Sequence, residues 1–123
     1  MIHLRFSIAG PRQIMTAPAA SFRFSAREIT ALPGQRPVAR FSSRMWQVDG
    51  RYFTRCECRE PARVQFEDAE GHLTDPVGPF NTVDLYGGSL YADKTLLARF
   101  DEARQVWGTL QPQADFVAII VGS

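Results

Sequence analysis

Arginine and aromatic side chains recur together between residues 36 and 63 of this chain. An arginine guanidinium donates two parallel hydrogen bonds to a phosphate or a carboxylate, and an aromatic ring on an open sheet can stack on a nucleic-acid base. The segment therefore has the residue types of an anion-binding surface. The residues that we expect to form this surface are Arg40, Arg44, Trp46, Arg51, Phe53, Arg55 and Arg59.

A β-hairpin would place these side chains on one side of a two-stranded ribbon. Asp49-Gly50 is a preferred sequence for a two-residue type I′ turn, and strand-forming residues flank it on both sides. The turn sets the register of the whole ribbon. The facing pairs that it predicts are Val48 with Arg51, Trp46 with Phe53, Arg44 with Arg55, and Arg40 with Arg59.

The opposed arginines need negative charge nearby, because like charges that face each other destabilise a sheet. The chain could supply this charge from Glu57, Glu60 and the acidic residues between 67 and 75. Asp84, which alternates with apolar residues in a predicted strand, could also pair with an arginine. The other source is an anionic partner, and the residues leave both interpretations open.

Charge is distributed unevenly along the chain. Residues 1–63 hold eleven of the thirteen arginines against four acidic residues, whereas residues 64–123 hold three basic residues against nine acidic ones. The two parts carry formal charges of +7 and −6, although the net charge is +1. This asymmetry indicates an anionic partner or mutual neutralisation of the two halves, and it would also allow copies of the chain to associate.

Cysteine and histidine form a second group with chemical potential. Cys56, Cys58 and His72 could supply three zinc ligands, or a thiol nucleophile with a histidine base. A fourth ligand is not evident, and two small buried thiols on the apolar side of a strand explain the cysteines better. We therefore expect no metal and no cofactor.

Gly87-Gly88 is the one glycine pair of the chain. A phosphate-binding loop requires a following Gly-Lys-Ser/Thr, which is missing here, so the pair indicates a turn. A small enzyme with its site near Cys56, Cys58 and His72, or at the loop 87–93, is the alternative to a binding protein.

The pattern predicts one α+β domain over residues 1–123, with a mainly antiparallel sheet of about six strands. Apolar residues recur at helical spacing after Asp93, which predicts a substantial helix at about 93–107 that packs on the sheet. Ser25 to Glu28 matches a capping box and predicts a short helix near 26–32, with a continued strand as the alternative. Further strands are predicted at 2–8, 21–25, 63–67, 80–86 and 116–121, and loops at 11–20 and 75–79.

The composition is that of a folded domain. Hydrophobic residues make up 45% of the chain, which is enough for a packed core. No apolar run approaches the roughly 20 residues that span a bilayer, and the first residues lack the apolar region of a secretory signal. We therefore expect a cytoplasmic protein that makes no membrane contact.

These observations predict a small non-enzymatic binding protein whose hairpin face engages an anionic partner. The partner would be an acidic protein surface or nucleic acid. The net charge near zero favours an acidic protein, because non-specific DNA binding relies on excess positive charge. An accessory subunit that pairs by a sheet edge, with a partner or with a second copy, is a further alternative.

Overall fold

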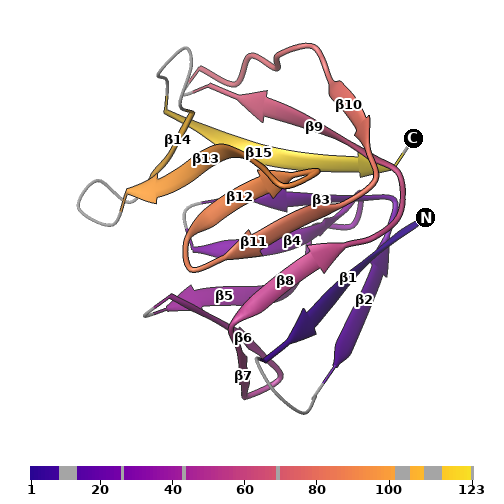
Figure 1. Ribbon diagram of the computed structural model, residues 1–123, viewed down its shortest axis with the longest axis vertical. Coiled ribbons are helices and arrows are strands. Elements are labelled where there is room, and N and C mark those ends of the chain that lie inside the picture. Colours follow the sequence, from indigo (N-terminus) through magenta and orange to yellow (C-terminus); the bar gives the residue numbers. More distant parts are fainter. Residues whose placement is uncertain are drawn as a thin grey trace.

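Every regular element in the described part of the chain is a β-strand. The computed structural model describes residues 1–8, 14–25, 27–42, 44–68, 70–101, 106–109 and 115–122, with the backbone alone at 106, 109 and 115–122. Its fifteen strands (Figure 1) are β1 (Ile2–Ser7), β2 (Met15–Ala19), β3 (Ser21–Phe24), β4 (Glu28–Leu32), β5 (Arg36–Ser42), β6 (Met45–Val48), β7 (Arg51–Phe53), β8 (Arg55–Cys58), β9 (Ala62–Glu67), β10 (Val77–Phe80), β11 (Val83–Tyr86), β12 (Ser89–Ala92), β13 (Thr95–Asp101), β14 (Val106–Thr109) and β15 (Asp115–Gly122).

The predicted α+β class is therefore wrong, and the fold is all-β and antiparallel. The described residues contain no helix, and hence none that is long and apolar enough to cross a membrane. The predicted count of about six strands is also too low, because several segments assigned to loops or helices form short strands.

Where the structure describes the segment predicted as a helix at 93–107, it forms a turn and strands, and residues 102–105 lie outside the described residues. Asp93 and Lys94 form the turn between β12 and β13 with φ values of 47° and 70°, which a right-handed helix cannot adopt. β13 pairs with β12 on one edge and with β14 on the other. The apolar residues of the predicted helix serve these strands instead, since Leu97 and Phe100 of β13 pack against the core and Trp107 of β14 is buried. Pairing along both edges has overridden the local helical spacing.

The short helix predicted near 26–32 is also wrong, and the alternative of a continued strand is confirmed over β4. The backbone N–H of Ser25 donates to the carbonyl oxygen of Glu28 at 3.0 Å, so these residues close a turn rather than cap a helix. Ile29 and Ala31 then alternate into the core.

The predicted loops at 11–20 and 75–79 overlap the strands β2 and β10, and residues 11–13 lie outside the described residues. Each of the two holds a proline, Pro18 or Pro79, and each pairs with a single neighbour among the described strands. Proline is tolerated on such edge strands because its missing N–H would otherwise point to solvent.

Several other local predictions are confirmed, although the strand predicted at 80–86 forms only over β11, Val83–Tyr86, with Phe80 belonging to β10. β1, β3, β9 and β15 occupy the predicted segments. Asp49-Gly50 joins β6 to β7 and Gly87-Gly88 joins β11 to β12, and all four residues have the positive φ that a type I′ turn requires.

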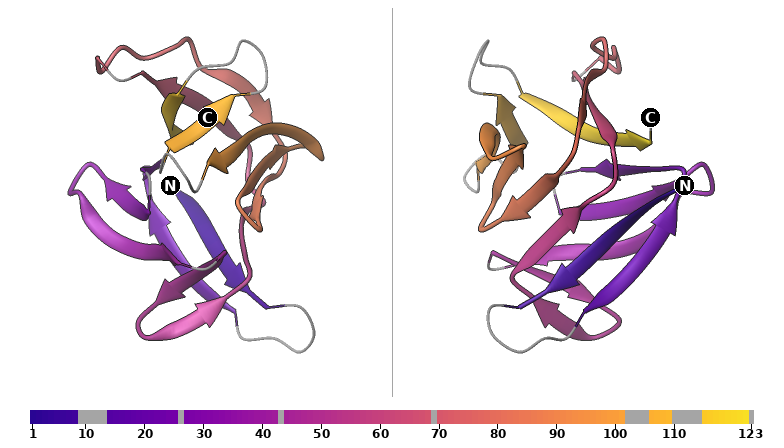
Figure 2. Two further views of the ribbon diagram at one scale, coloured as in Figure 1. Left: turned by 90° about the vertical axis from the view of Figure 1, so that its left-hand side faces the viewer. Right: turned by 45° about the vertical axis from the view of Figure 1, so that its right-hand side comes forward.

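Strand β15 connects strands from both halves of the chain. The strand order is β2-β1-β8-β11-β12-β13-β14-β15-β3-β4-β5-β6-β7, with β9 and β10 branching from β15. β15 pairs first with β14 and then lies between β3 and β9 (Figures 1 and 2). Segments far apart in the sequence are thereby held side by side.

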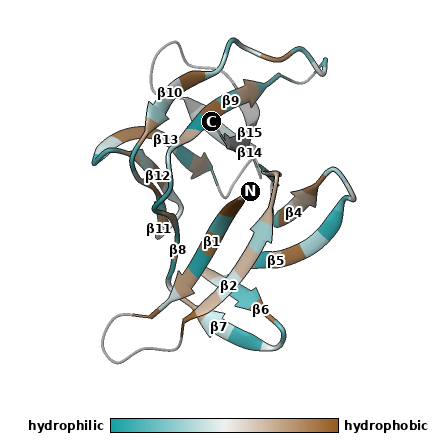
Figure 3. Cartoon of the chain, turned by 90° about the vertical axis from the view of Figure 1, so that its right-hand side faces the viewer, coloured by the Kyte–Doolittle hydropathy of each residue, from teal (hydrophilic) through white to brown (hydrophobic). Residues whose placement is uncertain are grey.

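The core contains a chain of aromatic rings. The ring centroid of Phe41 lies 4.7 Å from that of Trp46 and 5.5 Å from that of Phe100, which in turn lies 5.4 Å from Trp107. Apolar residues reach this core by strict alternation, which Figure 3 shows as bands along β1. The opposite face of the same strands is left for polar side chains.

Hydrogen bonds to the carboxylate of Glu60 connect β1 to the segment between β8 and β9. The Oε1 atom of Glu60 accepts a hydrogen bond from the backbone N–H of His3 at 2.7 Å, and its Oε2 atom lies 3.0 Å from Nδ1 of His3. Burial alone raises the pKa of Glu60, but the hydrogen bonds from His3 outweigh this and lower the pKa.

Substitution of Gly50 should destabilise the protein through the backbone alone. A Cβ atom at Gly50 meets nothing within 4 Å, but its φ of +78° is unfavourable for any other residue. We expect Gly50→Ala to lower the free energy of unfolding in urea by about 1 kcal/mol. Gly34→Ala is the matched control, because that site is equally open and has no positive φ. It should be neutral or stabilising by up to about 1 kcal/mol, and equal losses in both variants would contradict the turn.

The lowered pKa of Glu60 predicts that its contribution to stability depends on pH. A carboxylate with a folded pKa below its unfolded value stabilises the fold above the unfolded pKa and loses that effect as the pH falls through the folded pKa. Both side chains are partly exposed, so Glu60→Gln should cost about 0.5–1 kcal/mol at neutral pH. In denaturant titrations the difference from the parent protein should begin to shrink as the pH falls below the ordinary glutamate pKa of about 4.3, and it should vanish once the pH lies below the lowered folded pKa. A difference that grows toward acidic pH would refute this assignment.

Candidate functional site

The predicted hairpin forms, but it ends before the predicted arginine pairs. The register is confirmed as far as the pair of Trp46 and Phe53. At Thr54 the chain leaves the hairpin, and β8 pairs with β1 and β11. β6 pairs with β5 on its other edge. The oppositions predicted farther along the ribbon, Arg44 with Arg55 and Arg40 with Arg59, are therefore wrong.

The two aromatic residues of the predicted surface belong to the core. Trp46 is 2% exposed and packs against Phe24 and Phe41, and Phe53 is fully buried against Phe6. Their rings are therefore not accessible to a ligand. Pairing between β6 and β7 placed them together, but on the inner side of the sheet.

The predicted arginines lie on different strands. Arg40 is exposed on β5 with its Nε atom 3.9 Å from Glu28, and Arg51 of β7 lies over the ring of Phe53. Arg44 is exposed at the turn before β6. The other two predicted arginines lie on β8 and directly after it, in a separate network.

A row of charged and aromatic side chains crosses the outer face of four strands. β1, β8, β11 and β12 turn their apolar residues inward, and the alternate residues stay outside. The register places four of these outer residues in one row across the strands, in the order Arg5, Glu57, Asp84 and Tyr91. The next row on the same face holds Arg55 of β8 beside Tyr86 of β11.

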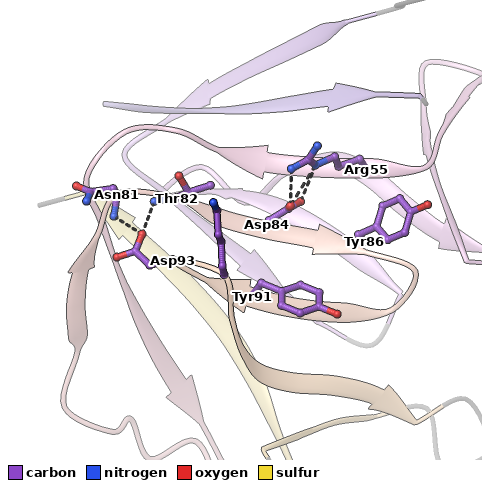
Figure 4. Close-up of a pocket in the computed structure, with 8 residues that line it drawn as sticks. Arg55, Asn81, Thr82, Asp84, Tyr86, Tyr91 and Asp93 are labelled. Carbon is purple, nitrogen blue, oxygen red and sulfur yellow. Dashed lines mark hydrogen bonds and ion pairs between the residues drawn. The ribbon is translucent and has the colours of Figure 1, made fainter. Parts of the chain in front are cut away.

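Glu57 is the centre of an ion-pair network on this face. The residue is 5% exposed, and its carboxylate lies 2.9 Å from Nη2 of Arg59 and 3.4 Å from Nη2 of Arg55. Arg55 also donates a forked pair of hydrogen bonds to Asp84, from Nε at 3.1 Å and from Nη2 at 2.7 Å (Figure 4). The hydrogen bonds to Asp84 raise the pKa of Arg55 above its already high value, so the guanidinium stays charged.

An open hollow of about 810 Å³ lies beside this network. Its volume falls within the range of small-molecule and cofactor sites, roughly 300–1,000 Å³. Asp93 shapes one wall, because its carboxylate accepts hydrogen bonds from the backbone N–H groups of Asn81 and Thr82 at 2.9 and 3.0 Å. We call this feature the polar hollow, and its lining residues (Figure 4) are Arg55, Asn81, Thr82, Asp84, Tyr86, Tyr91, Asp93 and Lys94.

A smaller recess of about 270 Å³ shares Arg55 with the polar hollow. In it, the guanidinium groups of Arg55 and Arg59 hold the buried carboxylate of Glu57. Arg5 lines the same recess without an ion pair to a described carboxylate. We call it the arginine recess, and its lining residues are Arg5, Ser7, Ile8, Ile14, Arg55, Glu57 and Arg59.

Two of the three acids that line the two depressions, Glu57 and Asp84, are already bound by arginines, and the third, Asp93, is exposed and accepts two backbone N–H groups through one oxygen. Within the described residues, no carboxylate lies within ion-pair distance of Arg5 or Lys94. This face can therefore bind an anion without first breaking an internal ion pair.

Sequence reasoning did not assign Arg5, Tyr86, Tyr91 or Lys94 to the site. Alternation within the strands indicates that the first two point away from the core, but their position beside β8 depends on long-range pairing. Lys94 was missed because the sequence predicted a helix at 93–107, whereas Lys94 lies in the turn before β13 and lines the polar hollow. The predicted pairing of Asp84 with an arginine is confirmed, and the arginine is Arg55.

Acidic residues between 67 and 75 pair away from the predicted arginine surface. Glu67 lies 2.6 Å from Nη2 of Arg23, and Asp68 lies 3.3 Å from Nδ1 of His72. An ion pair on the outer face also joins the two halves of the chain, between Arg55 and Asp84. Neutralisation between the halves is thus made by individual pairs rather than by an acidic face laid against a basic one.

Cys56 and Cys58 are buried on the inner side of β8. Burial raises the pKa of both thiols, which makes them poor nucleophiles. His72 is exposed and forms a cluster with Asp68 and Glu70 that includes neither cysteine. The structure thus does not bring the predicted thiol and histidine together.

No protein-family model, no curated protein and no solved structure matches this chain. The functional argument therefore rests on the geometry of the outer face.

The network predicts that Glu57 matters for stability far more than an exposed carboxylate does. Glu57→Gln keeps the shape of the side chain but removes the charge shared by two arginines, so we expect a loss of about 2 kcal/mol in urea unfolding. Glu28→Gln is the control, because Glu28 also lies on a strand and faces an arginine, but at 3.9 Å and largely exposed. It should cost less than about 0.5 kcal/mol. Similar losses for the two would show that Glu57 is not the centre of the network.

Proposed function

We propose that this protein is a small non-enzymatic binding protein that holds an anionic ligand on its outer face. The ligand would occupy the arginine recess and the polar hollow, which Arg55 joins. The proposal retains the anionic partner expected from the sequence and moves its site from the hairpin β6–β7 to the strands β1, β8, β11 and β12.

The observation that carries this proposal is the unequal use of the charged groups. The acids at the centre of the face already have internal partners, since Glu57 is buried and Asp84 accepts two hydrogen bonds from the guanidinium group of Arg55. The cations are more accessible, because the side chains of Arg55 and Arg59 are 43% and 57% exposed. A ligand that meets the arginine recess finds donors and positive charge, which favours phosphate or carboxylate groups, while the polar hollow adds Lys94 beside the exposed carboxylate of Asp93.

Binding without catalysis is supported by the state of the reactive groups. A general base needs a carboxylate that is free to accept a proton, and Glu57 and Asp84 are held by arginines. A thiol nucleophile needs a lowered pKa, whereas burial raises the pKa of Cys56 and Cys58.

The proposal predicts that a simple polyanion binds in a salt-sensitive way. This binding should depend on Arg5 and Lys94, the two cations of the site that have no ion pair to a described carboxylate. We expect fluorescein-labelled polyphosphate to bind at low salt, and Arg5→Gln/Lys94→Gln to weaken binding by about tenfold or more. Fluorescence anisotropy across a salt series provides the measurement. Removal of these two side chains should leave the unfolding free energy nearly unchanged, because neither belongs to the Glu57 network.

The control is Arg36→Gln/Arg63→Gln, which changes the net charge by the same amount at exposed positions outside both depressions. It should retain nearly all of the affinity. If the two double variants lose affinity equally, the binding reflects net charge alone, and the proposed site is wrong.

A further inference from the structure

We infer that the anionic ligand is single-stranded nucleic acid, with its phosphates on the cations of the outer face and its bases on two tyrosine rings. The inference rests on the proposed anion-binding function. Its basis is that the polar hollow brings aromatic rings and cations together on one open sheet, which phosphate binding alone does not require.

Tyr86 and Tyr91 provide the stacking surfaces. Tyr86 follows Asp84 by two residues on β11, and Tyr91 faces Asp84 from β12, so the two rings are diagonal neighbours on one face. Sheet geometry places such neighbours about 7–8 Å apart, a separation that leaves room for a planar base beside each ring. Tyr86 is 53% exposed, and among the described aromatic residues neither ring stacks on another.

The cations are placed for a backbone that runs across the strands. Arg5 lies on β1, and Tyr91 lies three strands away on β12, past Glu57 and Asp84. At about 4.8 Å per strand this path is roughly 14 Å long, which matches about four stacked nucleotides at a rise of 3.4 Å. The arginine recess lies at one end of this path, and Lys94 lines the polar hollow at the other.

The rings favour nucleic acid over an acidic protein. Carboxylates of a protein partner need the cations alone, whereas unpaired bases gain from every exposed aromatic face whatever their sequence. They also favour a single strand over a duplex, because the bases of a duplex already stack on one another. The near-zero net charge of the chain does not describe the arginine recess, because its one lining acid, Glu57, is paired with Arg55 and Arg59. Asp93, an acid of the outer face without an ion pair to a described cation, lies in the polar hollow.

The test compares three labelled anions on the same set of variants. The probes are an oligodeoxythymidine of about ten nucleotides, polyphosphate and polyglutamate, with thymidine monophosphate as competitor. We expect Tyr86→Leu/Tyr91→Leu to weaken oligonucleotide binding about tenfold or more and to leave polyphosphate binding within about twofold. Arg5→Gln/Lys94→Gln should weaken both and reduce the salt slope for the oligonucleotide by about 1.4.

Tyr52→Leu is the matched control, because Tyr52 is also 53% exposed but lies on β7 outside the hollow. It should bind the oligonucleotide as the parent protein does. The inference of a single strand is overturned if Tyr86→Leu/Tyr91→Leu leaves the affinity for the oligonucleotide unchanged. It is also overturned if thymidine monophosphate binds as tightly as the oligonucleotide. Tighter binding of polyglutamate than of the oligonucleotide overturns it in favour of an acidic protein, while the anion site stands. Failure of all three anions to bind refutes the proposed function itself.

Discussion

The pairing of β8 with β1 and β11 is the constraint on which both fold and site depend. It places the buried carboxylate of Glu57 beside Arg5 on one side and beside Asp84 on the other. The same pairing turns Cys56 and Cys58 into the core. A shift of one residue would exchange the two faces of the strand, so that thiols would meet solvent and the arginines would meet the apolar core.

This register also explains how an acid can stabilise a basic surface. A buried carboxylate is costly unless it is paired, and Glu57 is paired with Arg55 and Arg59. The pairing holds the two guanidinium groups close together, although like charges repel. Glu57 thereby keeps the arginines in place while remaining inaccessible, and the outer face presents their unused donors.

Local sequence signals predicted part of this structure for identifiable reasons. Asp49-Gly50 specified its turn because both residues tolerate positive φ, and alternation identified β1 because its inner face is apolar. The helix predicted at 93–107 failed because the same apolar residues also suit the strands β13 and β14. Sheet pairing on both edges of β13 decided between helix and strand, and no local pattern encodes that pairing.

The sequence by itself determined the turns at Asp49-Gly50 and Gly87-Gly88, the inner faces of the strongest strands and the excess of arginine in the first half of the chain. These follow from single residues or from neighbours a few positions apart. Only the tertiary structure decided that Trp46 and Phe53 face the core and that Arg55 meets Asp84, 29 residues away. The reason is that a strand can continue a hairpin or leave it. At Thr54 the chain leaves the hairpin, because β8 pairs with β1 and β11 along its edges and buries its apolar side in the core.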